Sequence, residues 1–419
     1  MKEPASGMPE PVVERRRRIP GWLRGVIWAV VAIAVMSTAS YATGVSALTS
    51  SNTASTALRL ALPILLCALG GLWSERAGVV NIGLEGMMIL GTFGAAWGAY
   101  YGGVWVGLLS AIAFGAIGGL LHAIATVTFN VNHIVSGVAI NLLGLGIAKY
   151  LANLIFEPIS GNPRQSPPVP KFDTYSASGL SDWLGTLENE QRVGISDVAG
   201  ILRGLITGVA PLTMIAIILV PVSYWILWHT RFGLRLRSCG ENPVAAESLG
   251  VNVYRYKYLG VLISGGFAGM GGASLVLLKG GADYLENQTN GRGYIGLAAM
   301  IFGNWRPGGL LGGAALFGYA DGLQLAGGGE AVLALLYGAV ILLAIIVVVQ
   351  LIRKRWLAAA LGVIGAGALY AIYWTNDTLP SDLIPYTAHF VTLIVLAVAS
   401  QRLRPPKADG APYRRGEGD

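Results

Sequence analysis

Long apolar runs without charged residues recur along nearly the whole of this 419-residue chain. A helix rises about 1.5 Å per residue, so roughly 20 such residues cross the hydrocarbon core of a bilayer. Hydrophobic residue types make up 54% of the sequence and charged types only 12%, which is too little charge for a soluble surface. We therefore predict an all-α, polytopic membrane protein.

The apolar runs divide the chain into twelve candidate membrane spans. They cover residues 24–46, 57–74, 79–101, 104–128, 133–157, 206–229, 257–279, 294–304, 309–326, 331–352, 356–374 and 384–401. The eighth span is short and follows a polar, glycine-rich segment, GGADYLENQTNGRGYIG. Irregular backbone at membrane depth needs protein or a water-filled cavity around it. We therefore expect residues 280–308 to form a hairpin or a broken helix inside the bundle.

Lysine and arginine gather in short clusters between the apolar runs. The clusters lie at residues 15–18, 231–237, 353–355 and 402–415. This is the positive-inside pattern, and alternate threading of the twelve spans places every cluster and both termini in the cytoplasm. The same threading predicts a cytoplasmic tail at 1–23, a transmembrane domain at 24–401 with an extracellular loop at 158–205 and a cytoplasmic loop at 230–256, and a second tail at 402–419. Because the net charge of +7 is distributed in this way, we exclude nucleic acid as a partner.

Glycine is abundant within the predicted helices. It is densest in GAIGG at residues 115–119 and in GGFAGMGG at residues 265–272. Small residues at such spacing let helix backbones approach one another closely in a membrane. A nucleotide-binding loop would need a preceding strand and an acidic residue about 20 residues further on, and the second stretch has no strand before it and no acidic residue at that distance. We therefore expect both stretches to lie at helix contacts.

Polar side chains inside the spans are the candidates for a solute path, because each costs about 2.5–3.5 kcal/mol at a helix centre and usually faces a cavity or a partner. Asn81 and Glu85 are four residues apart and are expected on one helix face. Asn141 lies in the fifth span, and Asp321 and Gln324 lie three residues apart in the ninth. Each has an alternative structural interpretation as a helix cap or a hydrogen-bonded buried group.

Catalytic and metal-dependent chemistry is poorly supported. His133 and Ser136 could face each other on one helix, but no third group completes a nucleophilic site. The four histidines are scattered singly, so no metal site is indicated, and no cofactor motif is present. The sequence also has no G-x-x-x-x-G-K-[ST] loop. We therefore predict a protein that is not an enzyme, and any ATP-binding machinery must be supplied by another chain.

A short polar helix is predicted between the sixth and seventh spans, in GENPVAAESLGVN at residues 240–252. Asn242 is a good N-cap, Pro243 suits the first turn, and Gly250 is a plausible C-terminal stop. About two turns of helix with small residues at Ala245 and Ala246 cannot be stable alone. The surface therefore calls for a partner groove, with an ordinary ordered loop as the alternative.

One acidic residue precedes this helix and another lies within it. Glu241 and Glu247 are expected either to contact basic residues of that partner or to face water.

The same stretch resembles the coupling loop of permease subunits of bacterial ABC importers in the branched-chain amino acid, ribose and nucleoside group. Three further stretches are similar to that group: LGGLWSERAGVVNIGLEGMMILG at 69–91, IFGNWRPGGLLGGAALFGYADGLQ at 301–324, and IPYTAHFVTLIVLAV at 384–398. The first is most like the second permease of purine-nucleoside importers related to simple-sugar systems. About ten spans resemble the family, and residues 331–374 form an additional pair that we interpret as an inserted peripheral hairpin.

The resemblance implies a multi-pass permease of the bacterial plasma membrane, surrounded by lipid and working with three kinds of partner. These are an ABC ATPase, a second permease that is either similar or identical, and an extracellular substrate-binding lipoprotein. The coupling element would consist of Glu241, Asn242, Pro243, Ala245, Ala246 and Gly250. The solute would be a nucleoside, with a simple sugar as the nearest alternative. A proton-coupled transporter that uses Glu85 is the alternative of another class.

Overall fold

The computed structural model describes residues 21–190, 192–376, 378 and 403–416, and within them it confirms the predicted all-α fold. The long helices are α1 (Gly21–Thr43), α2 (Ser51–Arg76), α3 (Leu84–Gly102), α4 (Val104–Ala123), α5 (His133–Ile155), α9 (Pro211–His229), α12 (Val253–Leu277), α14 (Pro307–Ile352) and α15 (Trp356–Thr375). The shorter helices are η1 (Ser46–Leu48), η2 (Ile124–Thr128, a π-helix), α6 (Glu157–Ser160), α7 (Ser178–Asn189), α8 (Ile195–Ile206), α10 (Arg231–Glu241), α11 (Pro243–Ser248) and α13 (Arg292–Phe302).

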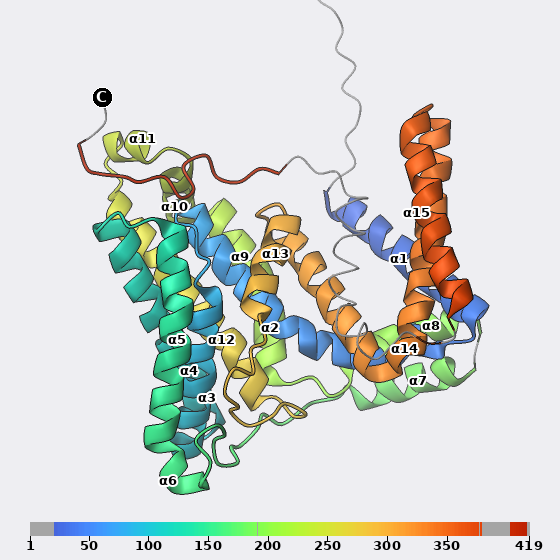
Figure 1. The fold of residues 1–419 in the computed structure, drawn as a ribbon, viewed down its shortest axis with the longest axis horizontal. Coiled ribbons are helices and arrows are strands. Elements are labelled where there is room, and N and C mark those ends of the chain that lie inside the picture. The colour runs from blue at the N-terminus through green and yellow to red at the C-terminus, as the bar shows by residue number, and fades with distance from the viewer. Residues whose placement is uncertain (1–20, 191, 377, 379–402, 417–419) are drawn as a thin grey trace, which may run out of the picture.

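Eight of the described helices are long and apolar enough to cross a membrane. They are α1, α2, α4 continued by η2, α5, α9, α12, α14 and α15. With 46 residues, α14 would be about 70 Å long if straight, more than twice the hydrocarbon thickness. Its backbone leaves helical geometry at Gly328, where φ is 57° and ψ is −148°. Figure 1 shows the result: the helix runs to one end of the molecule and returns beside α15. The two arms correspond to two predicted spans.

The remaining differences from the twelve predicted spans have local causes. The predicted broken helix is confirmed, since residues 278–291 are not helical and α13 has only 11 residues. The third predicted span begins late, because α3 starts at Leu84 and not near residue 79. The span predicted at 384–401, and the tail before residue 21, lie outside the described residues. The number of crossings and their direction stay predictions.

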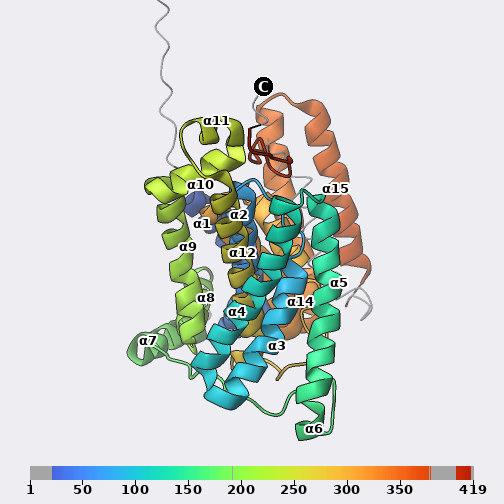
Figure 2. The same ribbon diagram turned by 90° about the vertical axis from the view of Figure 1, so that its left-hand side faces the viewer.

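Two helices form the centre of the bundle. The apolar windows of α2 and α12 are each 72% buried, whereas that of α15 is 6% buried. Helices α3, α4 and α5 lie together on one side, and α1, the second arm of α14 and α15 lie on the other (Figures 1 and 2). The second arm and α15 pack side by side, with the rings of Tyr337 and Tyr373 5.0 Å apart. The second arm and α15 therefore form the predicted helical hairpin at 331–374, and its nature as an insertion stays a prediction.

The two ends of the bundle carry different structures. One end holds α10 and α11, and the opposite end holds α6, α7 and α8 (Figure 2). The segment at 158–205 is therefore not a simple loop, because α7 and most of α8 lie in it. Residues 403–416, which we call the C-terminal strap, cross the α11 end (Figure 1).

Glycines bring α3, α4 and α12 together backbone to backbone, as the two glycine-rich stretches predict. A Cβ atom at Gly269 would lie 2.1 Å from the carbonyl oxygen of Ala111. One at Gly115 would lie 2.3 Å from the carbonyl oxygen of Gly265, and one at Gly91 would lie 2.4 Å from Cα of Gly269. No side chain fits at these distances, so the helices can pack this closely only with glycine.

We predict that Gly269→Ala lowers the thermal unfolding midpoint of the purified protein, because the added methyl group forces α12 away from α4. Overpacking of this kind costs at least about 1–3 kcal/mol. Gly266→Ala is the matched control in the same helix, because its Cβ would meet nothing closer than 3.4 Å. Equal midpoints for the two variants would contradict the packing described above.

Candidate functional site

A carboxylate inside the bundle holds the start of the broken helix. Glu85 lies in the first turn of α3 and is buried. Its Oε1 atom accepts hydrogen bonds from Thr289 Oγ1 (2.6 Å) and from the backbone N–H of Gly291 (2.9 Å), and its Oε2 atom accepts one from the backbone N–H of Gly293 (2.6 Å). Hydrogen bonds to a charged group are worth about 1.5–3 kcal/mol each, and the N-terminus of a helix favours an anion. Glu85 therefore fixes the position of α13.

Two asparagines complete this polar cluster. Asn141 Oδ1 accepts a hydrogen bond from the backbone N–H of Gly86 (2.7 Å), and its Nδ2 donates to Tyr294 Oη (2.8 Å). Asn81 Nδ2 donates to Ser264 Oγ (2.9 Å). The structure thus brings Asn81, Glu85 and Asn141 to neighbouring positions around the start of α3.

The expectation that Asn81 and Glu85 lie on one face of the same helix is wrong. Asn81 precedes α3, and its Oδ1 atom accepts a hydrogen bond from the backbone N–H of Gly83 at 3.0 Å. Asparagine side chains often bond the backbone two residues on, which competes with helix formation. The helix therefore begins after this turn, and the two side chains reach different partners.

Asp321 and Gln324 lie elsewhere in the bundle. Both are on the first arm of α14 and are partly buried. Their neighbours Gly318 and Gly322 pack on Ala57 of α2, whereas Gly296 of α13 packs on Cys67. Ala57 and Cys67 are ten residues apart in α2, which corresponds to about 15 Å along the helix axis. The five predicted path residues therefore occupy two levels of the bundle.

His133 and Ser136, which the sequence does not support as a nucleophilic pair, do not bond to each other. Ser136 Oγ pairs instead with Nδ1 of His122 from α4, at 2.9 Å. His133 Nδ1 accepts a hydrogen bond from the backbone N–H of Val80 (3.2 Å), and His122 Nε2 lies 3.0 Å from the carbonyl oxygen of Val80. The two histidines thus hold the irregular segment between α2 and α3.

The polar helix at the α11 end is capped as its sequence predicts. Asn242 accepts a hydrogen bond from the backbone N–H of Ala245 (3.0 Å), and Pro243 occupies the first turn. Gly250 has a φ of +81°, and its N–H donates to the carbonyl oxygen of Glu247. The N–H of Val251 donates to the carbonyl oxygen of Ala246, which completes a Schellman motif.

The two alanines of α11 face different ways. Ala245 is exposed as expected, but Ala246 is only 2% exposed and packs in a cluster with Cys239, Val253 and Tyr413. The expectation that Ala246 lies on the surface is therefore wrong, because α11 is anchored by this side chain. The most exposed apolar side chain here is that of Leu249, which directly follows α11 and is 84% exposed, whereas Val244 within α11 is 41% exposed.

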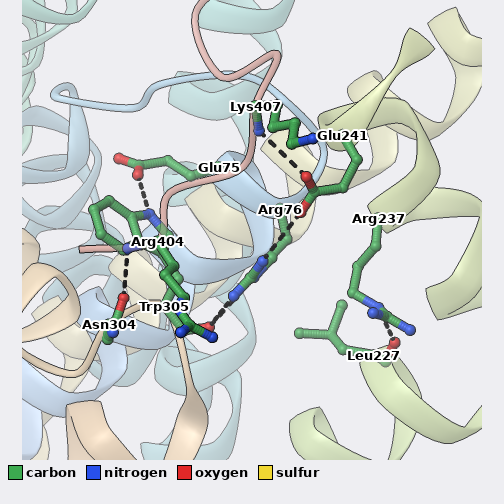
Figure 3. Close-up of polar contacts among 9 residues, drawn as sticks. All are labelled: Glu75, Arg76, Leu227, Arg237, Glu241, Asn304, Trp305, Arg404 and Lys407. Carbon is green, nitrogen blue, oxygen red and sulfur yellow. Dashed lines mark hydrogen bonds and ion pairs between the residues drawn. The ribbon is translucent and has the colours of Figure 1, made fainter. Parts of the chain in front are cut away.

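Glu241, just before α11, and Glu247, within α11, are both engaged within the chain. Glu241 Oε1 lies 3.6 Å from Nη1 of Arg76, and Glu247 Oε1 lies 3.3 Å from Nε of Arg415 in the strap. Figure 3 shows Arg76 between Glu241 and the carbonyl oxygen of Trp305, to which its Nη2 donates at 2.7 Å. The indole of Trp305 in turn donates to Glu75. Helix α2, the turn between α13 and α14, and α10 thus meet in one polar network.

A buried carboxyl group of the strap joins this network. Asp409 hydrogen bonds to Glu75 at the end of α2. Burial, and then the neighbouring Glu75, raise the pKa of Asp409 to about 9, against the opposing effects of Lys257 and Arg76. Asp409 is therefore protonated near neutral pH and can donate the hydrogen bond that joins the two carboxyl groups.

The family described as "Branched-chain amino acid transport system / permease component" matches residues 53–350 of the chain. The chain belongs to this family. The permease is therefore a multi-pass protein of the plasma membrane. The family match includes most of the second arm of α14 and leaves out α15.

The similar proteins include several with transport names. The permease is 39% identical over 277 residues to the guanosine ABC transporter permease protein NupQ of Bacillus subtilis (strain 168), covering 64% of this chain and 80% of NupQ. It is 34% identical over 273 residues to the nucleoside ABC transporter permease protein NupC of Lactococcus lactis subsp. cremoris (strain MG1363), with the same coverage. It is 35% identical over 274 residues to a putative glucose ABC transporter permease protein, TsgC13, of Haloferax volcanii, covering 64% of this chain and 75% of that relative. No solved structure matches the chain.

Several site residues were missed by reasoning from the sequence. Thr289 and Tyr294 lie in the polar segment before the eighth span, and the polarity of that segment was the available signal. Leu249 is an apolar residue within an otherwise polar helix end, which was a usable signal as well. Tyr413 had no comparable signal, because its partners are about 160 residues earlier in the sequence.

We predict that the strap of this permease docks less tightly as the pH rises. In an undocked strap Asp409 ionises at its ordinary pKa of 3.8, and in the docked strap at about 9. Between these values each pH unit lowers the docking equilibrium constant by up to about tenfold, and above pH 9 the dependence ends. Hydrogen exchange of the Ala408 N–H, which donates to the carbonyl oxygen of Gly240, measures docking once corrected for the intrinsic exchange rate.

The control for this measurement is Asp409→Asn, which keeps a hydrogen-bond donor but cannot ionise. Its corrected protection should depend on pH less steeply than that of the wild type. A wild-type slope no steeper than that of Asp409→Asn would contradict the assignment of a protonated Asp409.

Proposed function

We propose that the chain is the transmembrane permease subunit of an ATP-driven importer, and that it forms a path for nucleosides. The observation that carries the proposal is α11, a two-turn helix that is capped at both ends and anchored by Ala246. Leu249 at its end faces outward. The sequence contains no ATP-binding loop of its own. An apolar residue on a short charged helix is suited to a partner groove, where a few buried side chains supply most of the binding free energy.

The orientation of the chain follows from its basic clusters. Residues 231–237 and 353–355 lie at the α11 end, as do the basic residues of the strap (Figures 1 and 2). The positive-inside tendency places this end in the cytoplasm, and the α7 end outside. An ABC ATPase would dock on α11, an extracellular substrate-binding lipoprotein would dock at the α7 end, and a second permease would complete the path. We include Glu241, Asn242, Pro243, Ala245, Ala246 and Gly250 in the coupling element, and we add Leu249.

The proposed solute is a nucleoside because two of the similar permeases are named for guanosine and nucleosides. A simple sugar is the second candidate, favoured by the relative that is named for glucose. The polar cluster of Asn81, Glu85 and Asn141 offers a level in the membrane where a hydroxylated solute could exchange hydrogen bonds. Asp321 and Gln324 would act at a second level, nearer the α7 end.

Proton-coupled transport through Glu85 is less well supported. A proton carrier must be free to gain and lose its proton during transport, whereas the carboxylate of Glu85 accepts three hydrogen bonds from the 289–293 segment. A structural role for Glu85 therefore fits its surroundings better.

We predict that the complete complex in proteoliposomes takes up labelled guanosine when ATP is supplied, and that an uncoupler leaves this uptake unchanged. Excess unlabelled uridine or adenosine should compete, and excess ribose or glucose should not. Uptake that collapses with the uncoupler while ATP is held constant would contradict the ABC proposal. Competition by the sugar alone would assign the path to simple sugars.

We also predict that Leu249→Arg reduces ATP-driven uptake at least tenfold while membrane insertion is retained. Placing a charge in an apolar groove costs about 2 kcal/mol or more, which is roughly thirtyfold in affinity for the ATPase. Co-purification of the ATPase and uptake are the two measurements. Leu234→Arg is the control, because Leu234 is exposed at the same end of the molecule but lies on α10.

This pair of variants is sharper than a substitution of Ala246, which is buried and would disturb α11 itself. Normal uptake by Leu249→Arg would show that α11 does not enter a groove of the partner.

A further inference from the structure

The C-terminal strap is pinned to three separate parts of the α11 end. The backbone N–H of Arg404 donates to Asn304 Oδ1 in the turn between α13 and α14, at 2.8 Å (Figure 3). The N–H of Lys407 lies 3.4 Å from Glu241 Oε2, and the N–H of Ala408 donates to the carbonyl oxygen of Gly240 at 2.9 Å. Asp409 then contacts Glu75 of α2. The strap therefore connects the turn after α13, which we call the base of α13, with the end of α2 and the end of α10.

Beyond Asp409 the strap packs against the buried side of α11. Tyr413 is 6% exposed, and its ring lies 5.6 Å from that of Tyr254 and 5.7 Å from Nζ of Lys257. It shares a cluster with Ala246, which is the one buried residue of α11. Arg415 continues the contact through its ion pair with Glu247. The strap thus covers the side of α11 that faces the bundle.

The position of a six-residue helix must be fixed by its contacts with the rest of the protein. Helices this short are unstable in water, so the location of α11 depends on what its buried face contacts. That face is small, because it consists of Ala246 alone. Tyr413 is the largest of the buried side chains in the cluster that receives it, so the strap contributes a major part of the site.

We propose that the C-terminal strap is a brace that fixes α11 relative to the base of α13, so that a displacement of α11 by a partner reaches the transmembrane helices. The proposal rests on the proposed function, in which that partner is the ATPase. The strap holds the turn at one end of α13, and Glu85 holds the other end. A braced α11 is therefore connected to the polar cluster in the bundle, and Tyr413 is a positioning residue for it.

The first test measures the brace without any transport. In the purified full-length chain, Tyr413→Ala should reduce the protection of the Val251 N–H of the Schellman motif from hydrogen exchange at least tenfold. Tyr413→Phe keeps the ring and should stay within about twofold of wild type. Unchanged protection in Tyr413→Ala would overturn the brace, whatever the complex transports.

The second test measures its effect on coupling in the complete complex. Tyr413→Ala should retain the ATPase subunits and their ATP hydrolysis but lose at least fivefold in solute uptake, whereas Tyr413→Phe should transport normally. Full uptake by Tyr413→Ala would overturn the proposal. Absence of ATP-driven uptake in the wild-type complex would instead refute the proposed function. The hydrogen-exchange measurement would then still show whether Tyr413 holds α11 in place.

A cross-link provides evidence that does not depend on a destabilising variant. Glu247→Cys combined with Arg415→Cys joins the strap to α11, and each single variant is its control; the native Cys67 and Cys239 are buried. A brace that stays docked predicts uptake equal to that of the reduced protein. Uptake that is lost on oxidation and restored by reductant would show that the strap must detach, and would overturn the proposal.

Discussion

The hydrogen bonds of Glu85 are the interaction on which the membrane part of this structure depends. Lipid cannot satisfy free backbone groups, so a chain that turns inside a bundle must find partners there. The carboxylate of Glu85 supplies acceptors for the segment that turns into α13, and Gly293 allows close approach, because a Cβ there would lie 2.6 Å from the backbone of Glu85. Helix α13 can therefore begin within the protein, and its far end is directed at the turn that contacts α2 and the strap.

Backbone contact between glycines explains how that carboxylate is enclosed. Apolar side chains gain little by leaving lipid for protein, so close packing of backbones holds membrane helices together. The contacts at Gly91, Gly115 and Gly269 bring α3, α4 and α12 to distances that exclude a side chain. This packing sets α3 in place, and α3 carries Glu85. At the α11 end, where water is available, polar groups and aromatic rings take over the same task.

Local sequence patterns predicted the features that depend on neighbours in the chain. These are the long apolar helices, the caps at Asn242 and Gly250, the glycine contacts and the break before α13. The misassigned features have two causes: one depends on a distant part of the chain, and the other on a competing local hydrogen bond. Ala246 was expected on the surface because the residue that covers it, Tyr413, lies in a tail that reads as polar and basic. Asn81 does not share a helix face with Glu85, because its side chain accepts a hydrogen bond from the backbone of Gly83 and the helix begins after that turn. The bond between Ser136 and His122 of α4 could not be predicted, because spacing within one helix carries no information about another helix.

The central claim is that this permease receives its energy from a separate ATPase at the α11 end. Native mass spectrometry of the complex, isolated from the membrane through a tag on this chain, tests that claim most directly. The account predicts a particle that contains ATPase subunits, and predicts that the Leu249→Arg chain is recovered without them. A wild-type chain that is isolated free of any ATPase and still transports solute in proteoliposomes would contradict the account.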